Sequence, residues 1–249
     1  MTCEACNTIA PVMAVGYEPK GDWVEVAALK TYIAGDKSTA TKAIVEVYDI
    51  FGPSNQTLQG ADLLAAALNA IVLVPDLLKG EYAQYTWFAN PTPENTALKN
   101  AFMGKVMMAF GPYVELLASV VIDAKAKFDG ISSWGGLGLC WGGKVTVLLS
   151  GPESVYNTSA QVHPGALAKA DAEKISIPHI LLASNGEDPE VVKEYKAILE
   201  GEGKPGVVET YPTMHHGWMG TRANLNNPEN LREYERGYNQ VAAYFSKYL

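Results

Sequence analysis

The stretch Gly138-Leu139-Cys140-Trp141-Gly142-Gly143 directly follows a short apolar run, Trp134–Leu139, and directly precedes a segment of helical pattern. Where a strand turns at once into a helix, backbone atoms approach so closely that the residues two positions before and after the turn must lack side chains. Gly138 and Gly142 meet this requirement. The pattern is typical of a nucleophile elbow in which Cys140 takes the position that serine usually holds.

The expected position of the Cys140 sulfur favours its ionised form. A thiol above the first turn of a helix lies near about half a positive charge and close to backbone N–H donors, which stabilise a thiolate. A free cysteine has a pKa of about 8.5, so only a few per cent is ionised at neutral pH and a neighbouring base is still required.

Short β-branched runs alternate with longer segments of helical pattern along the chain, which predicts a mostly parallel, twisted sheet with helices on both faces. Two initial strands, Pro11–Tyr17 and Trp23–Ile33, are separated by a turn-rich linker and are expected to form an antiparallel hairpin. We expect a single domain over residues 1–249, with residues 1–10 as a flexible tail. The later strands are expected over Ala43–Tyr48, Ile71–Val74, Trp134–Leu139, Ser159–Val162, His179–Ala183 and Val207–Tyr211.

The segments between these strands predict helices and one irregular excursion. Lys79–Asn95 carries several aromatic residues among Gly, Asn and Pro, and we interpret it as a loop that covers a site. Helices are expected over Leu58–Asn69, Thr96–Phe128 with a break at Gly111-Pro112, Glu190–Glu200 and Pro228–Leu249.

Composition narrows the classes of partner. The chain has 249 residues, of which 48% are hydrophobic, and a net charge of −8. Such a charge repels phosphate backbones and anionic lipid heads, so we expect a small-molecule partner rather than nucleic acid or a membrane. No secretion signal is recognisable at the start of the sequence, and three cysteines are too few for a disulfide framework, so a cytoplasmic location is expected.

Two of the three cysteines, Cys3 and Cys6, form a C-x-x-C pair. A structural zinc site needs four ligands, and neither a second cysteine pair nor suitably spaced histidines follow. We therefore expect no metal and no cofactor.

An acid and then a histidine should follow the nucleophile if the chain has the α/β-hydrolase fold, each on the loop after a later strand. Asp188 and His216 meet this requirement in the right order. Each has a neighbour of the same chemistry, Glu187 and His215, and spacing alone does not separate the neighbours.

Together the elbow GLCWGG, the NGED loop and the HHGW loop resemble the dienelactone hydrolase family, and the segments DIFG, TLQGAD and VPD resemble its fungal-type members. The resemblance extends from about Trp23 onward. It implies that Cys140 is the nucleophile, Asp188 the triad acid and His216 the triad base. It also implies an oxyanion hole made by the backbone N–H groups of Trp141 and Ile50.

Several positions depart from the family pattern. Asp49 stands where bacterial members have a glutamate that hydrogen-bonds the resting thiol, and Gly220 stands where they have a substrate-binding arginine. Arg222 is a candidate substitute for that arginine, or else a surface ion-pair residue. A second arginine, expected on the excursion after the fourth strand, is also missing, and Tyr82, Gln84 and Tyr85 are present there instead. His163 either lines the pocket or has a structural role.

These observations predict a cysteine-dependent hydrolase of small lactones or activated esters that works through an acyl-enzyme. The missing arginines favour a neutral or singly charged substrate over a dicarboxylate. Two alternatives remain open, namely a lyase, isomerase or cyclase that uses the same triad, and a ligand-binding protein without turnover. We expect a monomer or a homodimer.

Overall fold

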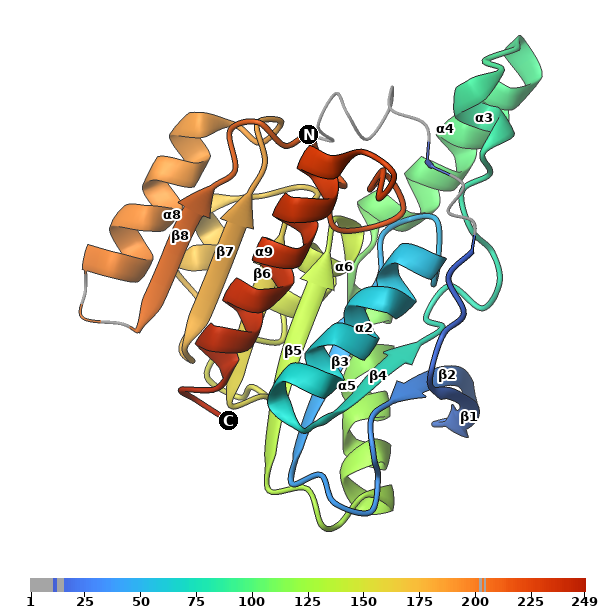
Figure 1. Cartoon of the computed structure of the whole chain (residues 1–249). Helices are drawn as coiled ribbons and strands as arrows, with labels where there is room; N and C mark the ends of the chain where they lie inside the picture. Colours follow the sequence, from blue (N-terminus) through green and yellow to red (C-terminus); the bar gives the residue numbers. More distant parts are fainter. Residues whose placement is uncertain (1–10, 13–15, 202, 204) are drawn as a thin grey trace.

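The computed structural model describes residues 11–12, 16–201, 203 and 205–249, and its centre is an eight-stranded sheet (Figure 1). The strand order is β1-β2-β4-β3-β5-β6-β7-β8, with β1, β2 and β4 joined by antiparallel pairing and the remaining neighbours parallel. The strands are β1 (Asp22–Val26), β2 (Leu29–Ala34), β3 (Lys42–Val47), β4 (Ile71–Pro75), β5 (Ser133–Leu139), β6 (Thr158–Val162), β7 (His179–Ala183) and β8 (Gly206–Thr210).

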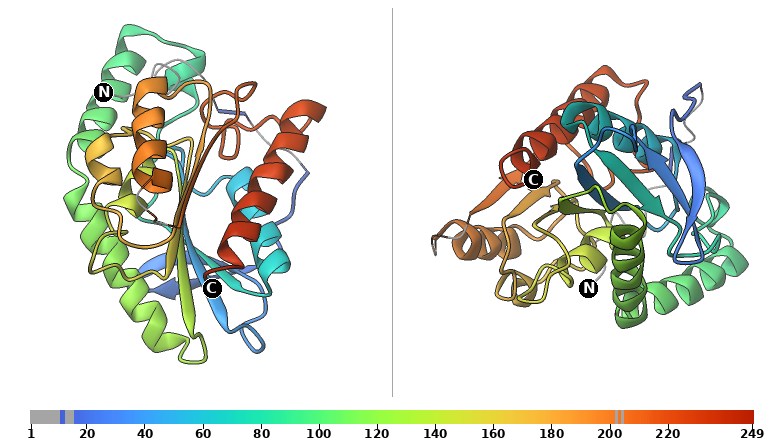
Figure 2. Two further views of the ribbon diagram at one scale, coloured as in Figure 1. Left: turned by 90° about the vertical axis from the view of Figure 1, so that its left-hand side faces the viewer. Right: turned by 90° about the horizontal axis from the view of Figure 1, so that it is seen from below.

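Helices cover both faces of this sheet, with α2 and α9 on one face and α5, α6 and α8 on the other (Figures 1 and 2). This arrangement confirms the predicted α/β-hydrolase fold. The described helices are α2 (Asn55–Leu68), α3 (Thr86–Ala89), α4 (Pro93–Met108), α5 (Gly111–Lys127), α6 (Trp141–Val147), α7 (Lys169–Ala172), α8 (Pro189–Gly201) and α9 (Pro228–Phe245).

The N-terminal hairpin is antiparallel as predicted, but its turn lies elsewhere. Chain reversal occurs at Ala27 and Ala28, both with positive φ, in the middle of the segment expected to be one strand. The first strand was expected over Pro11–Tyr17. The described residues of this segment do not form a strand, and residues 13–15 lie outside the described residues. Gly21 is required for close packing rather than for the turn, because an added Cβ there would overlap the carbonyl of Ile33. The predicted flexible tail over residues 1–10 also lies outside the described residues.

The predicted break at Gly111-Pro112 is confirmed, since α4 ends at Met108 and α5 begins at Gly111. α4 extends beyond the sheet together with α3 (Figure 1). Within the described residues, no single helix has the length and apolar character needed to cross a membrane. The α4–α5 pair passes that test only when taken together, and it is bent by 62°.

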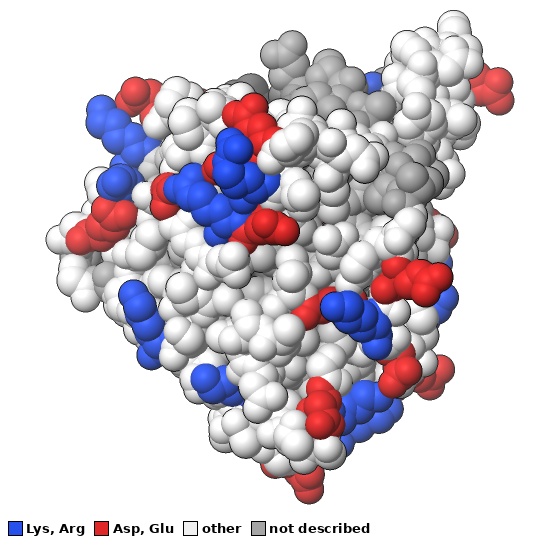
Figure 3. All heavy atoms as spheres, viewed as in Figure 1, with Lys and Arg blue, Asp and Glu red and all other residues white. Residues whose placement is uncertain are grey.

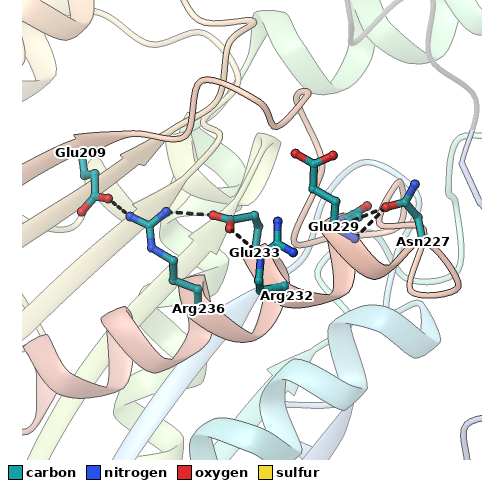
Figure 4. Close-up of polar contacts among 7 residues, drawn as sticks. Glu209, Asn227, Glu229, Arg232, Glu233 and Arg236 are labelled. Atoms are coloured by element: carbon teal, nitrogen blue, oxygen red, sulfur yellow. Dashed lines mark hydrogen bonds and ion pairs between the residues drawn. The ribbon is translucent and has the colours of Figure 1, made fainter.

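At the other end of the chain, α9 is fixed to the sheet by polar contacts (Figure 4). Asn227 caps the helix by accepting hydrogen bonds from the N–H groups of Glu229 and Asn230 at 2.9 and 3.1 Å. Arg236 pairs with Glu233 on the same helix and with Glu209 on β8. Lys and Arg side chains on this face lie beside Asp and Glu, so the charges alternate in sign over the surface (Figure 3).

Buried polar groups also lie inside the sheet layers. His179 is fully buried, with its Nδ1 2.7 Å from Ser159 Oγ and its Nε2 3.1 Å from Gln161 Oε1. The amide of Gln161 in turn donates to the carbonyl of Gly143, 3.0 Å away, and so connects this cluster to the elbow helix. Burial lowers the pKa of His179 to about 3.

A second interior group is Glu46, in the middle of β3. It is fully buried, and the hydroxyl of Tyr238 donates to its Oε1 at 3.2 Å. Burial is the main cause that raises the pKa of Glu46 to about 8, which keeps the carboxyl largely protonated at neutral pH.

Candidate active site

The elbow has the strained geometry that its glycines predict. Cys140 lies between β5 and α6 with φ 53° and ψ −113°, a combination that L-residues rarely adopt, and only 1% of the residue is exposed. An added Cβ at Gly138 would overlap the backbone of Gly142, and one at Gly142 would overlap the carbonyl of Val47. The turn therefore closes only with glycine at both positions.

Trp141, the first residue of α6, anchors this turn to the helices that cover it. Its indole Nε1 donates to the carbonyl of Val106 on α4, 3.1 Å away. Its ring makes an edge contact with Tyr113, at 5.0 Å between centroids, and a stacked contact with Tyr48, at 6.3 Å. These contacts fix the start of α6, where the Trp141 N–H is positioned.

His216 and Glu187 form a buried pair at the same edge of the sheet. His216 Nδ1 lies 2.7 Å from Glu187 Oε1, and both side chains are essentially inaccessible to solvent. The second carboxylate oxygen of Glu187 accepts from the backbone N–H of Ser184, which fixes the carboxylate after β7. The carboxylate at Nδ1 fixes the orientation of the imidazole ring.

The residue beside Glu187 does not have the role that the sequence predicted for it. Asp188 is exposed, and its Oδ1 accepts a hydrogen bond from the N–H of Glu190 at 3.0 Å, at the start of α8. The prediction of Asp188 as the acid that orients the imidazole is therefore wrong, and Glu187 holds that position. The physical reason is that the turn after β7 directs residue 187 inward and residue 188 to the helix terminus.

Of the two adjacent histidines, His215 points away from this pair. It is half-buried, and its Nε2 lies 3.2 Å from the carbonyl oxygen of Arg222. Burial is the main cause that lowers its pKa. The side chain of Arg222 is also buried, with its guanidinium 4.8 Å from the ring centre of Phe51 and 5.8 Å from that of Phe88. Arg222 is therefore an interior residue rather than a surface one.

Asp49 connects the loop after β3 with the loop after β8. Its carboxylate accepts hydrogen bonds from the N–H and hydroxyl of Thr221, at 2.8 and 3.0 Å, and from the N–H of Phe51 at 2.9 Å. This carboxylate thus holds the two loops together, and its predicted contact with the Cys140 thiol stays a prediction. Ile50 is buried in the same turn, next to the elbow in the sheet order.

Gly220 lies against this carboxylate. A Cβ added to Gly220 would come within 2.6 Å of Asp49 Oδ2 and 3.8 Å of His163 Cε1. Any side chain at position 220 would therefore displace Asp49. The absence of an arginine at this position is thus a consequence of how the loop is packed.

His163 follows β6 directly and contacts the paired histidine. It is fully buried, its backbone has φ 38°, and its ring centre lies 5.2 Å from that of His216 in an edge-to-face contact. Neither ring nitrogen has a hydrogen-bond partner among the residues that the structure describes. Burial first, and then the neighbouring His216, holds the pKa of His163 well below its usual range.

Tyr85 lies at the surface of the protein. It is 46% exposed and lines a depression of about 350 Å³ together with Phe51 and Thr221.

Among the described residues, no three His, Cys, Asp or Glu side chains form a group able to hold a metal ion. The pair Cys3 and Cys6 lies outside the described residues.

A scan against models of known protein families matches residues 29–249 to the dienelactone hydrolase family. The chain belongs to this family. That membership makes it an ester hydrolase by class and confirms the resemblance seen in the elbow and the later loops.

Similar proteins agree with the family assignment. An uncharacterized AIM2 family protein of Schizosaccharomyces pombe is 32% identical over 93% of either chain. A hydrolase named pyvD from Aspergillus violaceofuscus is 24% identical, covering 93% of this chain and 92% of its own. The crystal structure of a dienelactone hydrolase from Anabaena variabilis superposes with a TM-score of 0.67 at 16% identity, covering 94% of this chain and 100% of that one. These relatives confirm the fungal-type resemblance and the fold.

The sequence contains a signal that identifies the role of Asp188. It directly precedes Pro189, and proline is favoured at the first position of a helix, with aspartate among the best residues just before it. The pair Asp-Pro therefore indicates a helix cap, which leaves Glu187 as the carboxylate available to the histidine.

Proposed function

We propose that this dienelactone hydrolase family member is a cysteine-dependent hydrolase of small lactones or activated esters. In this proposal Cys140 is the nucleophile, His216 the general base, and Glu187 the group that orients the imidazole. The observation that carries it is the buried His216–Glu187 pair at the sheet edge where the strained elbow presents Cys140.

The proposed reaction has two halves. His216 takes the proton of the Cys140 thiol, and the sulfur attacks the ester carbonyl carbon. The C–O bond to the alcohol then breaks, and the imidazolium returns its proton to the departing oxygen, leaving a thioester on Cys140. Water attacks this thioester while His216 accepts a proton, which releases the acid and restores the thiol.

The carbonyl oxygen carries negative charge in both halves. We assign its stabilisation to the backbone N–H groups of Trp141 and Ile50. The first lies at the N-terminus of α6 and the second in the turn that Asp49 holds. Each such donor is worth on the order of 3 kcal/mol of barrier.

The sulfur nucleophile limits the substrate. A thiolate leaves a tetrahedral intermediate easily, so the alcohol must be a comparably good leaving group for the thioester to form. Enol-lactones, activated esters and thioesters satisfy this condition, whereas amides do not. The substrate is a small molecule in this proposal, and no cofactor takes part.

The test compares the wild-type protein with Cys140→Ala and Cys140→Ser on 4-nitrophenyl acetate, with mass spectrometry of the quenched reaction. We expect an acetyl adduct on Cys140 in the wild type and a loss of at least about 10³-fold in kcat for Cys140→Ala. A double Cys3→Ala, Cys6→Ala variant is the matched control and should retain activity and its sensitivity to iodoacetamide.

Full activity in Cys140→Ala would contradict the proposal. Turnover that requires Cys140 but never forms an acyl adduct would instead favour a lyase, isomerase or cyclase that uses the same residues. Saturable binding without product would favour a ligand-binding protein.

A further inference from the structure

His163 is a buried polar side chain that the fold does not use. Its residue exposure is 0%, yet neither ring nitrogen meets a partner among the described residues. Burying a donor or acceptor without a partner is unfavourable because its hydrogen bonds to water are lost, so such groups are uncommon in folded proteins. The positive φ of 38° adds backbone strain at the same residue. Two unfavourable features at one position point to a role outside folding.

The position of His163 places it beside the reacting groups. β6 pairs with β5, and the N–H of Cys140 donates to the carbonyl of Val162, the residue just before His163, at 3.1 Å. The ring of His163 lies 5.2 Å from the ring of His216. An atom hydrogen-bonded to His163 would therefore lie only a few bonds from a carbonyl bound over Cys140.

Burial is the main cause that lowers the pKa of His163 and favours its uncharged imidazole. The neighbouring His216, and then Arg222 and His215, act in the same direction. A neutral imidazole has one N–H donor and one acceptor nitrogen, which suit a hydroxyl or a carbonyl. Unlike an arginine, it supplies no charge and no bidentate fork for a carboxylate.

Packing at position 220 leaves no room for the substrate-binding arginine that bacterial family members have there. A side chain at Gly220 would collide with Asp49, whose carboxylate is itself fixed by Thr221. After Asp49, the nearest side chain to this position is His163, whose Cε1 lies 3.8 Å from the added Cβ.

We propose that His163 determines specificity by hydrogen-bonding an uncharged oxygen on the acyl part of the substrate, within two or three bonds of the scissile carbonyl. The preferred substrates are then hydroxy- or oxo-substituted acyl esters and lactones. This inference rests on the proposed hydrolysis at Cys140 and adds the chemical class of the acyl group.

The kinetic test uses three esters of similar acyl size, namely the 4-nitrophenyl esters of butanoate, 3-hydroxybutanoate and hemisuccinate. We expect the wild type to prefer the hydroxylated ester over the plain one by about tenfold in kcat/KM and to disfavour the hemisuccinate. His163→Phe should lower kcat/KM on the hydroxylated ester at least about fivefold more than on the plain ester, which removes most of this preference.

His163→Asn is the matched variant, because asparagine tolerates positive φ and has both a donor and an acceptor. It should retain part of the preference and fold as the wild type does. If His163→Phe slows all three esters equally, or keeps the hydroxyl preference, the inference is overturned. A wild-type preference for the hemisuccinate also overturns it.

A binding measurement separates this inference from the proposed hydrolysis. Calorimetry with 3-hydroxybutanamide and butanamide, which a thiol does not cleave, should show tighter binding of the hydroxylated amide to the wild type and equal binding to His163→Phe. If no ester is turned over but this difference is present, the hydrolysis proposal fails and the role of His163 stands. Equal binding of both amides to the wild type overturns the role of His163.

Discussion

Two buried histidines on neighbouring strands differ in how the protein treats their nitrogens. His179, at the start of β7, has both nitrogens engaged by Ser159 and Gln161 inside the sheet layers. His163, just after β6 at the carboxyl edge, has neither engaged by a described residue. Burial is the first cause that lowers the pKa of both. Burial and charge therefore do not separate a structural histidine from a functional one, whereas an account of hydrogen bonds does. His179 is satisfied by partners inside the sheet layers, whereas His163 keeps both ring nitrogens available for a ligand.

The edge side of this comparison is tested most strongly at Glu187. Glu187→Gln keeps the volume but removes the charge that orients and stabilises the imidazolium, so we expect kcat on an activated ester to fall roughly 10³- to 10⁴-fold with little change in melting temperature. Asp188→Asn, one residue away and exposed, should change kcat less than threefold. Equal losses in the two variants would show that the His216–Glu187 pair does not carry the chemistry.

The interior side is tested at His179. His179→Leu leaves Gln161 Oε1 without its partner and removes the contact to Ser159, so the free energy of unfolding should fall by about 2–3 kcal/mol. For a chain of this size we expect the melting temperature to fall by roughly 5–10 °C. The His163→Asn protein is the control and should melt within about 2 °C of the wild type. A comparable loss in both variants would break the distinction between the two histidines.

Glu46 and His179, both buried inside the sheet layers, make the stability of the fold depend on pH in opposite directions. The pKa of Glu46 is about 8 in the folded chain against an ordinary 4.5, so between those values unfolding releases a proton and stability falls as pH rises, by about 1.4 kcal/mol per unit. For His179 the folded pKa is about 3 against an ordinary 6.5, so its contribution is lost as pH falls below 6.5. The two slopes oppose each other between pH 4.5 and 6.5.

Above pH 6.5 only the Glu46 slope remains, and we expect the wild type to lose about 2 kcal/mol between pH 6.5 and 8 from this group. Glu46→Gln should remove that loss, as measured by urea denaturation at each pH. A variant whose stability falls as steeply as that of the wild type would mean that Glu46 is already ionised in the fold.

The smallest effect on activity and stability is expected at Tyr85. Tyr85 is 46% exposed, so Tyr85→Ala removes only partly buried surface beside the loop after β3. We expect kcat/KM to change less than threefold and melting temperature to stay within about 2 °C. A change above tenfold in KM alone would show that Tyr85 contacts the substrate.

The sequence was most informative where sterics leave one solution. The elbow could be predicted because Gly138 and Gly142 are both required by backbone contacts, and those contacts recur wherever a strand turns directly into a helix. The order of nucleophile, acid and histidine followed from the same fold. The break between α4 and α5 was visible at Gly111-Pro112 because proline ends a preceding helix.

The errors occurred where the backbone conformation is not encoded by residue type. The hairpin turn uses Ala27 and Ala28 in left-handed conformations that alanine seldom adopts, while Asp22, from the segment with the composition of a turn, begins β1. Glu187 and Asp188 are chemically alike, and only the phase of the turn after β7 decides which one faces the histidine. The tie between Asp49 and Thr221 joins loops that have no sequence pattern in common.

The hydrogen bonds between Asp49 and Thr221 also determine when the site can form during synthesis of the chain. Asp49 and Thr221 are 172 residues apart, and Thr221, His216 and Glu187 all lie in the last quarter of the sequence. A nascent chain released up to the end of β7 contains the elbow and its thiol, but neither the histidine nor the contact that steadies the turn holding Ile50. On the ribosome the thiol therefore remains without its base, and the site is completed only when almost the whole chain has emerged.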